Sequence, residues 1–387
     1  SPHPLLGLLG AIKKIQLLDG STVLDQLDNC NVYNAFQNAN QSNDSNISMN
    51  RNLNFVRTGY VAQGNYTVTG NQFDNNQILL QPQFYPSYTG NLINNQKCWI
   101  SLKEMLPFLK SSMILPTGIF RQLRVVIEYN SAADLELLTR VTNAAKTTKS
   151  ESLLLCEEFQ DQSTKDALEK EYKGVVYRPV ESEKVSVPAA TGAVDTAAGN
   201  VEEQRNNYLL NGFNNKKLMK LLIQVEQTDK TQFVNANELV GFGNLGSLSQ
   251  YHSTVNFRVN GKNLLPGAGL RGSGSGLGEQ SGSYANRRLG YLNDAYGVFN
   301  VIPGQQVTNY AARGNFYPDS ILGTVGQQDY IGLNIFENIS ELQLTFNRNC
   351  VFNNPKLNQA LNLNIFGEVE KAVVMNEDKS YNVIYVQ

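Results

Sequence analysis

The chain has 387 residues, which is too long for one ordinary β-sandwich domain and long enough for two. Only 17% of the residues are charged and the formal net charge is −2, so the sequence has no basic face or arm for binding nucleic-acid phosphates. About one residue in eight is asparagine, which favours tight turns, and the plentiful tyrosine and phenylalanine favour strands. These features indicate an all-β chain with long polar loops.

The cysteines and the hydropathy pattern exclude further classes. Four scattered cysteines are too few for a disulfide scaffold and lack the spacing of a zinc site, so we expect buried free thiols at Cys30, Cys98, Cys156 and Cys350. No apolar run is long enough to span a membrane, and no signal peptide is evident. The apolar run Leu5–Leu18 begins almost at once, so we expect that residues upstream of it have been cleaved or deleted.

The first half of the chain alternates strand patterns with turns. Ala11–Gly20 and Ser21–Leu27 are two apolar runs around an Asp-Gly turn, which predicts a hairpin. Leu102–Leu109 is predicted to be a short helix capped by Ser101. Apolar and polar residues then alternate over Phe120–Tyr129, as expected of a half-buried strand.

A charged helix divides the chain. Ser152–Phe159 is predicted to be a strand, and a helix follows at 163–173, with Ser163 as its cap and Gly174 as its stop. Val175–Val187 again has a strand pattern. The helix is therefore expected to close one β block and to lead into a second.

The second block has the same pattern of strands and turns. Lys216–Glu226 and Ser253–Val259 are predicted strands, and Asn260-Gly261 turns the latter. Gly267–Gly282 is rich in glycine and serine and indicates a loop. The last strand candidates are Ser340–Phe346, Leu361–Val369 with an extension to Met375, and Tyr381–Val386. Strands with turns and almost no helix predict a sandwich or barrel.

No motif in the sequence predicts catalytic, cofactor-binding or metal-binding residues. The two histidines, His3 and His252, have no accompanying nucleophile elbow. The glycine-rich loop lacks the Gly-Lys-Ser/Thr of a phosphate loop, and the acids near Glu202 lack the spacing of a calcium loop. Trp99 lies in an apolar run, which favours core packing over a sugar platform. The sequence leaves open a pair of carboxylates for sugar hydrolysis, because such pairs come together only in the folded chain.

The order of these segments resembles the double jelly-roll major capsid proteins of nucleocytoplasmic large DNA viruses, virophages and Polinton-like viruses. The resembling stretches are the early strand pair Ala11–Asp25, the elements Leu106-Pro-Phe108, Leu115-Pro116 and Val125-Val-Ile127, the joint Ser152–Val187, the strand and turn Thr254–Asn263, and the approach Pro303–Asn315. Each motif is weak alone, and their shared order carries the resemblance.

The resemblance implies two tandem eight-stranded jelly-roll sandwiches and no enzymatic activity. The first roll would span 1–174, lack its leading strands and end with the helix at 163–173, and the second would span 175–387. The implied protein is a homotrimer that forms a pseudo-hexagonal capsomer of an icosahedral shell. Its further partners would be neighbouring capsomers, penton proteins and minor capsid proteins, with no direct binding of nucleic acid.

The implied location is the virion, after assembly inside the infected host cell; whether a membrane underlies the shell stays open. Four segments are candidates for the outer loops and trimer contacts, namely 34–54, 70–97, 188–212 and 262–290. An alternative of another class is a secreted tandem β-sandwich that binds carbohydrate or acts in adhesion, which would need a secretory route. A β-sandwich hydrolase is a third hypothesis, weakened by the scarcity of histidine.

Overall fold

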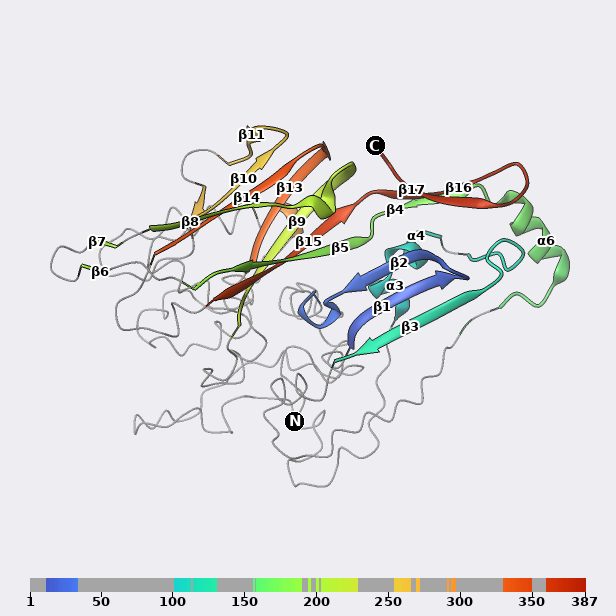
Figure 1. Cartoon of the computed structure of the whole chain (residues 1–387). Coiled ribbons are helices and arrows are strands. Elements are labelled where there is room, and N and C mark those ends of the chain that lie inside the picture. Colours follow the sequence, from blue (N-terminus) through green and yellow to red (C-terminus); the bar gives the residue numbers. More distant parts are fainter. Residues whose placement is uncertain are drawn as a thin grey trace, which may run out of the picture.

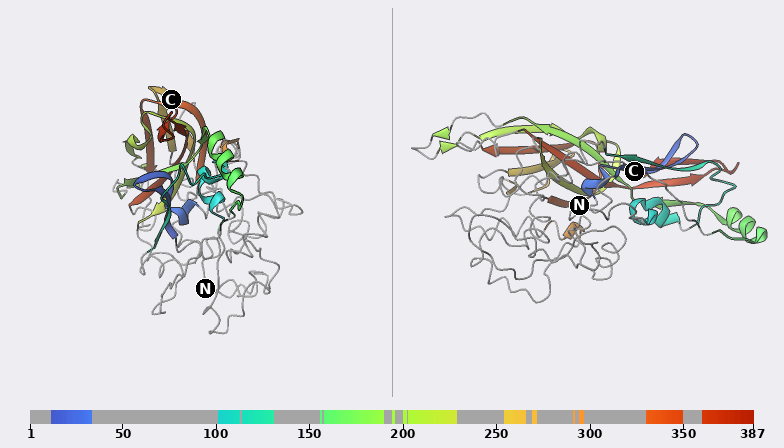
Figure 2. Two further views of the ribbon diagram at one scale, coloured as in Figure 1. Left: turned by 90° about the vertical axis from the view of Figure 1, so that its right-hand side faces the viewer. Right: turned by 90° about the horizontal axis from the view of Figure 1, so that it is seen from below.

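The computed structural model describes residues 12–33, 101–112, 114–130, 156, 158–189, 194–195, 200–201, 203–228, 254–265, 269–271, 291, 294–296, 330–349 and 360–387 (Figure 1). Every strand pairing within these residues is antiparallel. The predicted all-β class is therefore confirmed. The described part is elongated, with α6 (Gln162–Glu171) near one end and the small pair β6 (Val194–Asp195) and β7 (Asn200–Val201) near the other (Figure 2).

The predicted early hairpin is confirmed. It consists of β1 (Ile12–Asp19) and β2 (Thr22–Asp28), and β1 also pairs with β3 (Leu123–Tyr129), which gives the sheet order β2-β1-β3. Gly20 in the connecting turn has a φ of +59°, a conformation that glycine adopts without strain. The Asp-Gly chemistry of the turn thus set the register of the hairpin locally.

The predicted helix at Leu102–Leu109 is wrong as a single element. The chain forms two short helices, α3 (Leu102–Met105) and α4 (Pro107–Ser112), and the side chain of Ser101 forms no capping hydrogen bond. Pro107 explains the break, because proline has no N–H to donate within a helix but fits the first helical position.

The charged helix exists, but its predicted ends are wrong. Helix α6 spans Gln162–Glu171, and its cap is Asp161, whose Oδ2 accepts the backbone N–H of Thr164 at 2.8 Å. Ser163 instead donates its hydroxyl to the same carboxylate. The strand expected at 152–159 does not continue to its end, since residues 156 and 158–160 have no regular structure; its other residues lie outside the described ranges.

A long ribbon of two paired strands runs through the molecule. One side is β4 (Gly174–Tyr177) followed by β5 (Val180–Val187), and the other is β15 (Leu361–Val369) followed by β16 (Lys371–Met375). The single strand expected at Val175–Val187 is thus two, separated at Arg178-Pro179, and the expected extension to Met375 is a separate strand after Glu370. Strand β17 (Tyr381–Tyr385) pairs with β16, so one end of the ribbon lies in the sheet β17-β16-β4.

The remaining strands build a second sandwich. They are β8 (Glu203–Leu209), β9 (Lys216–Gln227), β10 (Thr254–Val259), β11 (Lys262–Asn263), β12 (Leu270–Arg271), β13 (Tyr330–Ile339) and β14 (Leu342–Asn349), with the short 3-10 helix η3 at Asn211–Phe213. One sheet has the order β13-β9-β15-β5, and the other has the order β11-β10-β14-β8, with β12 beside β10.

The connectivity of this second sandwich is that of a jelly roll. Among the larger strands, the chain passes from β5 in one sheet to β8 in the other, back to β9 and across again to β10, and it alternates in the same way through β13, β14 and β15. Strands that are neighbours in the chain therefore mostly lie in opposite sheets, as in two interlocked Greek keys. The predicted turn at Asn260-Gly261 is confirmed, with both residues at positive φ.

Two of the longer strands were not evident in the sequence pattern. Residues 203–209, expected within an outer loop at 188–212, form β8, and Tyr330–Ile339 forms β13. The expected loop at 262–290 is described only in part, and there Leu270–Arg271 pairs with β10 as β12. The other loops expected at 34–54 and 70–97 lie outside the described residues.

Two hydrophobic cores fill the described structure. The first lies among β1, β2, β3, the helices α3 and α4, and the inner face of β17-β16-β4; the second lies between the two sheets of the jelly roll. The first core includes Tyr177 and Val373, with Val383 packed against it, so the division between the cores does not coincide with the expected division at 174/175. As a division into domains, 1–174 and 175–387 stays a prediction.

The two cores meet at one sheet of the second sandwich. Leu222 of β9 and Phe366 of β15 turn away from their own core and belong to the first, where the ring of Phe366 lies 5.4 Å from that of Tyr33. In the cross-strand pair two residues further along, the buried side-chain amide of Asn364 donates to the side-chain oxygen of Gln224 at 2.7 Å. This sheet is therefore buried on both faces, and the sandwiches pack directly together.

Candidate functional site

The residues weighed for chemistry in the sequence lie mostly outside the described structure. His3, His252 and Trp99 are among them, as is most of the glycine-rich loop. Within the described ranges, no three His, Cys, Asp or Glu side chains lie close enough to hold a metal ion. The same ranges contain no helix that is long and apolar enough to cross a membrane. Of the cysteines expected to be buried, Cys30 is buried, but Cys156 is exposed.

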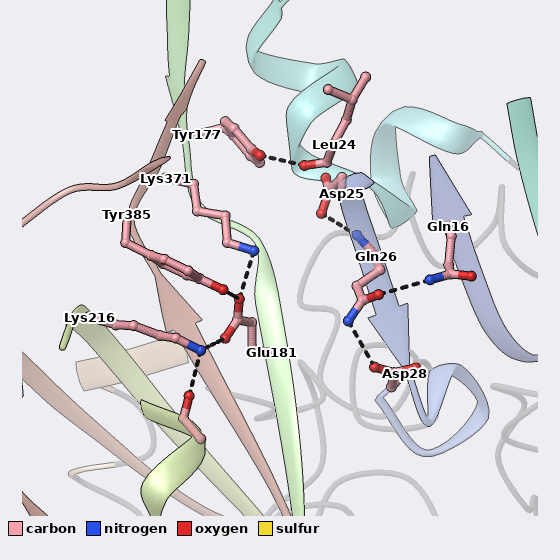
Figure 3. Close-up of polar contacts among 11 residues, drawn as sticks. Gln16, Leu24, Asp25, Gln26, Asp28, Tyr177, Glu181, Lys216, Lys371 and Tyr385 are labelled. Atoms are coloured by element: carbon pink, nitrogen blue, oxygen red, sulfur yellow. Dashed lines mark hydrogen bonds and ion pairs between the residues drawn. The ribbon is translucent and has the colours of Figure 1, made fainter. Parts of the chain in front are cut away.

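The main polar feature is a cluster at the joint between the two sandwiches (Figure 3). The Glu181 carboxylate of β5 accepts Lys216 Nζ at 2.5 Å and Lys371 Nζ at 2.7 Å, and the Tyr385 hydroxyl donates to it at 2.6 Å. Both lysine nitrogens lie 4.6 Å from the centre of the Tyr385 ring. The cluster thus links β5, the start of β9 and the C-terminal sheet.

The charges in this cluster shift the titration of its members. Burial raises the pKa of the Glu181 carboxyl, but Lys371, Lys216 and the Tyr385 hydroxyl outweigh this effect, and the pKa lies below its usual value. Burial and the Glu181 carboxylate together raise the pKa of Tyr385 to about 12. Glu181 is therefore ionised and Tyr385 is neutral at pH 7.

A second polar group lies beside the cluster inside the first core. A β-bulge opposite Leu17 and Leu18 turns Asp25 inward next to Leu24, and Asp25 is only 1% exposed. Its carboxyl accepts the backbone N–H groups of Gln26 and Phe108, both at 2.8 Å. Asp25 therefore caps the first turn of α4 from a strand that is distant in the sequence.

The environment of Asp25 disfavours its charge. Burial raises the pKa of the carboxyl to about 7, although the two N–H donors and the nearby Lys371 lower it. Within the described structure Asp25 forms no ion pair. Tyr177 of β4 completes the contact, since its hydroxyl donates to the carbonyl of Leu24 and its ring meets the Phe108 ring edge-on at 5.2 Å.

The outer face of the sheet β17-β16-β4 is apolar. Val176, Val374 and Ile384 are exposed on its three strands, and Ala372 pairs with both Val176 and Ile384. Antiparallel sheets usually present polar residues to solvent on the face that does not pack on the core. This face is therefore a candidate contact surface.

Sequence patterns gave few signals for these features. Lys216 and Lys217 form a basic pair at the start of a predicted strand, and Asp25 is a single acid in an apolar run. Their partners lie far along the chain, so no spacing rule connects them. The apolar outer face could not be predicted either, because it forms only when three strands from distant parts of the chain become neighbours.

The protein was compared with known families and structures. No protein-family model matches the sequence, and no curated protein matches it. Two solved structures align over 100% of this chain and 86% of their own chain: the quasi-atomic model of the PBCV-1 virus capsid, with 11% identity and a TM-score of 0.46, and PBCV-1 VP54 fitted into a reconstruction of the virophage Sputnik, with 10% identity and a TM-score of 0.42.

A further match is the mavirus major capsid protein, with 8% identity and a TM-score of 0.27 over 55% of this chain and 42% of that one. The chain is similar to viral capsid proteins. The jelly-roll strand order is read from this chain's own sheets.

Proposed function

We propose that this chain is a structural major capsid protein that trimerises into a pseudo-hexagonal capsomer and tiles an icosahedral viral shell. The observation that supports this proposal is the architecture. One sheet of the jelly-roll sandwich packs on the first β-sandwich core, and one paired ribbon runs through both. The protein would be located in the virion, after assembly inside the infected host cell.

The architecture suits a tile for a geometric reason. Two sandwiches side by side give one chain two similar edges, so three chains around an axis present six sandwiches and a nearly hexagonal outline. Hexagonal outlines fill a flat facet without gaps. A ring of three identical chains needs a head-to-tail interface that closes, since each copy presents one surface to the copy before it and another to the copy after it.

The described surface supports self-association. Permanent interfaces bury about 2,000–5,000 Å² and are rather apolar, and the outer face of β17-β16-β4 offers exposed apolar side chains. Contacts between neighbouring tiles would be smaller and more polar, as suits a weakly charged chain, and they would gain strength by repetition. Penton and minor capsid proteins would be further partners. The near-neutral charge favours a wall around the genome over direct binding of nucleic acid.

Size-exclusion chromatography with light scattering tests this proposal on the full chain. We expect a mass of three chains, and negatively stained images should show hexagonal tiles or their arrays. A monomer that persists at high protein concentration would contradict the proposal. A single tight ligand on a glycan array, together with a monomer, would favour the carbohydrate-binding alternative instead.

A further inference from the structure

The paired ribbon bends where it passes from one sandwich to the other (Figure 1). The bend lies at Arg178-Pro179 on one strand and at Glu370 on the other. The strands stay paired across it, because the N–H of Val369 donates to the carbonyl of Pro179 at 3.0 Å. Two-stranded ribbons twist more freely than wider sheets, so the angle at such a bend needs support from the sides.

One side of the bend is held by Glu181. Its carboxylate binds Lys216 of β9 and Lys371 of β16, and the side chains of these three residues are only 13–18% exposed. Lys216 also donates to the carbonyl of Gly212 at 2.5 Å, which ties the cluster to η3. The bend is thereby attached on this side to the second sandwich and to the C-terminal sheet.

The other side is held by Glu370, at the bend itself. Its carboxylate binds Lys217 Nζ at 2.6 Å and Arg178 at 3.3 Å, while its backbone N–H donates to the carbonyl of Lys217 at 3.1 Å. The backbone N–H of Val386 donates to the Glu370 carbonyl at 3.0 Å. Glu370 therefore connects both strands of the ribbon, β9 and the end of the chain.

The two lysines are consecutive residues of β9. Successive side chains of a strand point to opposite faces, so Lys216 and Lys217 reach acids on the two sides of the ribbon from a single point. Charge-assisted hydrogen bonds are short and directional, whereas apolar contacts such as those of Phe366 allow small sliding movements. This arrangement restrains the bend in both directions.

We propose that Lys216 and Lys217, bound to Glu181 and Glu370, form a two-sided ionic clamp that fixes the angle between the two sandwiches. The inference deepens the proposed capsid function and rests on it for its purpose: flat tiling requires every chain to hold the same angle. The Glu181 pairs are mostly buried, whereas Lys217 and Arg178 on the Glu370 side are 34% and 49% exposed. Such ion pairs often add little net stability, but they can specify one geometry among several.

Hydrogen–deuterium exchange measured by mass spectrometry on the full chain tests the clamp. In the wild-type protein, the bend amides of Val369 and Glu370 should exchange as slowly as the amides in the middle of β15. In the double variant Glu181→Gln/Glu370→Gln, they should exchange at least about tenfold faster, while β10 and β14 stay unchanged. Small-angle X-ray scattering should show a broader distribution of dimensions for the double variant.

The matched control is Glu128→Gln, which removes an ion pair with Lys13 in which both side chains are about half exposed. It should leave exchange and scattering unchanged. Fast exchange at the bend in the wild-type protein would overturn the clamp without any variant, so the test does not depend on the double variant folding. Unchanged exchange and scattering in a folded double variant would also overturn it.

The outcomes separate the clamp from the capsid proposal. A wild-type monomer with a protected bend would refute the capsid proposal and leave the clamp standing. A wild-type trimer whose double variant has the same exchange and forms the same flat arrays would refute the clamp alone.

Discussion

Replacing Asp25 with alanine should change both the stability of the protein and its dependence on pH. The carboxyl is buried and accepts two backbone N–H groups, from Gln26 and Phe108. The substitution leaves both donors without this acceptor, and each buried unsatisfied donor costs about 1–3 kcal/mol. At pH 5, where the buried carboxyl is neutral, we therefore expect a loss of roughly 2–6 kcal/mol in the free energy of unfolding.

The pH dependence follows from the raised pKa. Burial raises the pKa of Asp25 from 3.8 to about 7, so the folded state holds a proton that the unfolded state has lost. The resulting stabilisation is complete below the unfolded value and is lost as the pH rises through about 7. Each pKa unit corresponds to roughly 1.4 kcal/mol, so the free energy of unfolding of the wild-type protein should fall by roughly 4 kcal/mol between pH 4 and pH 8 because of this carboxyl.

Urea unfolding at a series of pH values measures both effects. The free energy of unfolding of the wild-type protein should fall from pH 5 to pH 8, and the Asp25→Ala variant should lose most of this slope. The variant should therefore be most destabilised in acid and least destabilised at pH 8. Asp28→Ala is the control, because Asp28 lies on the same strand, is partly exposed and pairs with Lys14. Equal slopes in the wild-type protein and the Asp25 variant would refute the reasoning.

Three further predictions concern the second sandwich and the joint. Gly367→Ala should lower the free energy of unfolding by about 1–3 kcal/mol in denaturant titrations, because a Cβ there would overlap Phe213 and Leu218; an unchanged midpoint would contradict it. Phe366→Ala should cost about 3–5 kcal/mol, since the ring is fully buried where the cores meet, and a loss below about 1 kcal/mol would show that the cores are independent there. The pKa of Glu181 is lowered from 4.5, so its ionised carboxylate stabilises the folded protein above pH 4.5, and this stabilisation is lost as the pH falls. The free energy of unfolding of Glu181→Gln should therefore fall less steeply with acid than that of the wild-type protein. Parallel acid curves would argue against this.

Local chemistry made some elements predictable from the sequence. Asp19-Gly20 and Asn260-Gly261 specify their turns because glycine and asparagine adopt positive φ at little cost. The alternation of apolar and polar residues in β3 has the period of a strand, so its secondary structure is also set by nearby residues. Helix α6 was evident for the same reason, although the choice between Asp161 and Ser163 as its cap depended on geometry.

Other elements depended on neighbours that the sequence pattern does not identify. Strand β8 contains mostly polar residues and is a strand because β14 supplies its hydrogen bonds. In β13 the alternation of buried and exposed residues breaks at Phe336, which has a φ of +56° beside a register shift, and burial resumes only at Ile339.

The fold and the candidate site together divide into features set by local sequence and features set by distant segments. The sequence by itself determined the all-β class, the charged helix, the main turns and the near-neutral net charge, because each depends on composition or on residues close together in the chain. The tertiary structure alone decided which strands pair across more than a hundred residues, why Asp25 faces inward, and how Lys216 and Lys217 meet acids on two sides of the ribbon. Long-range pairing decided these features, because a side chain's partner and its exposure to water depend on which distant segment is packed against it.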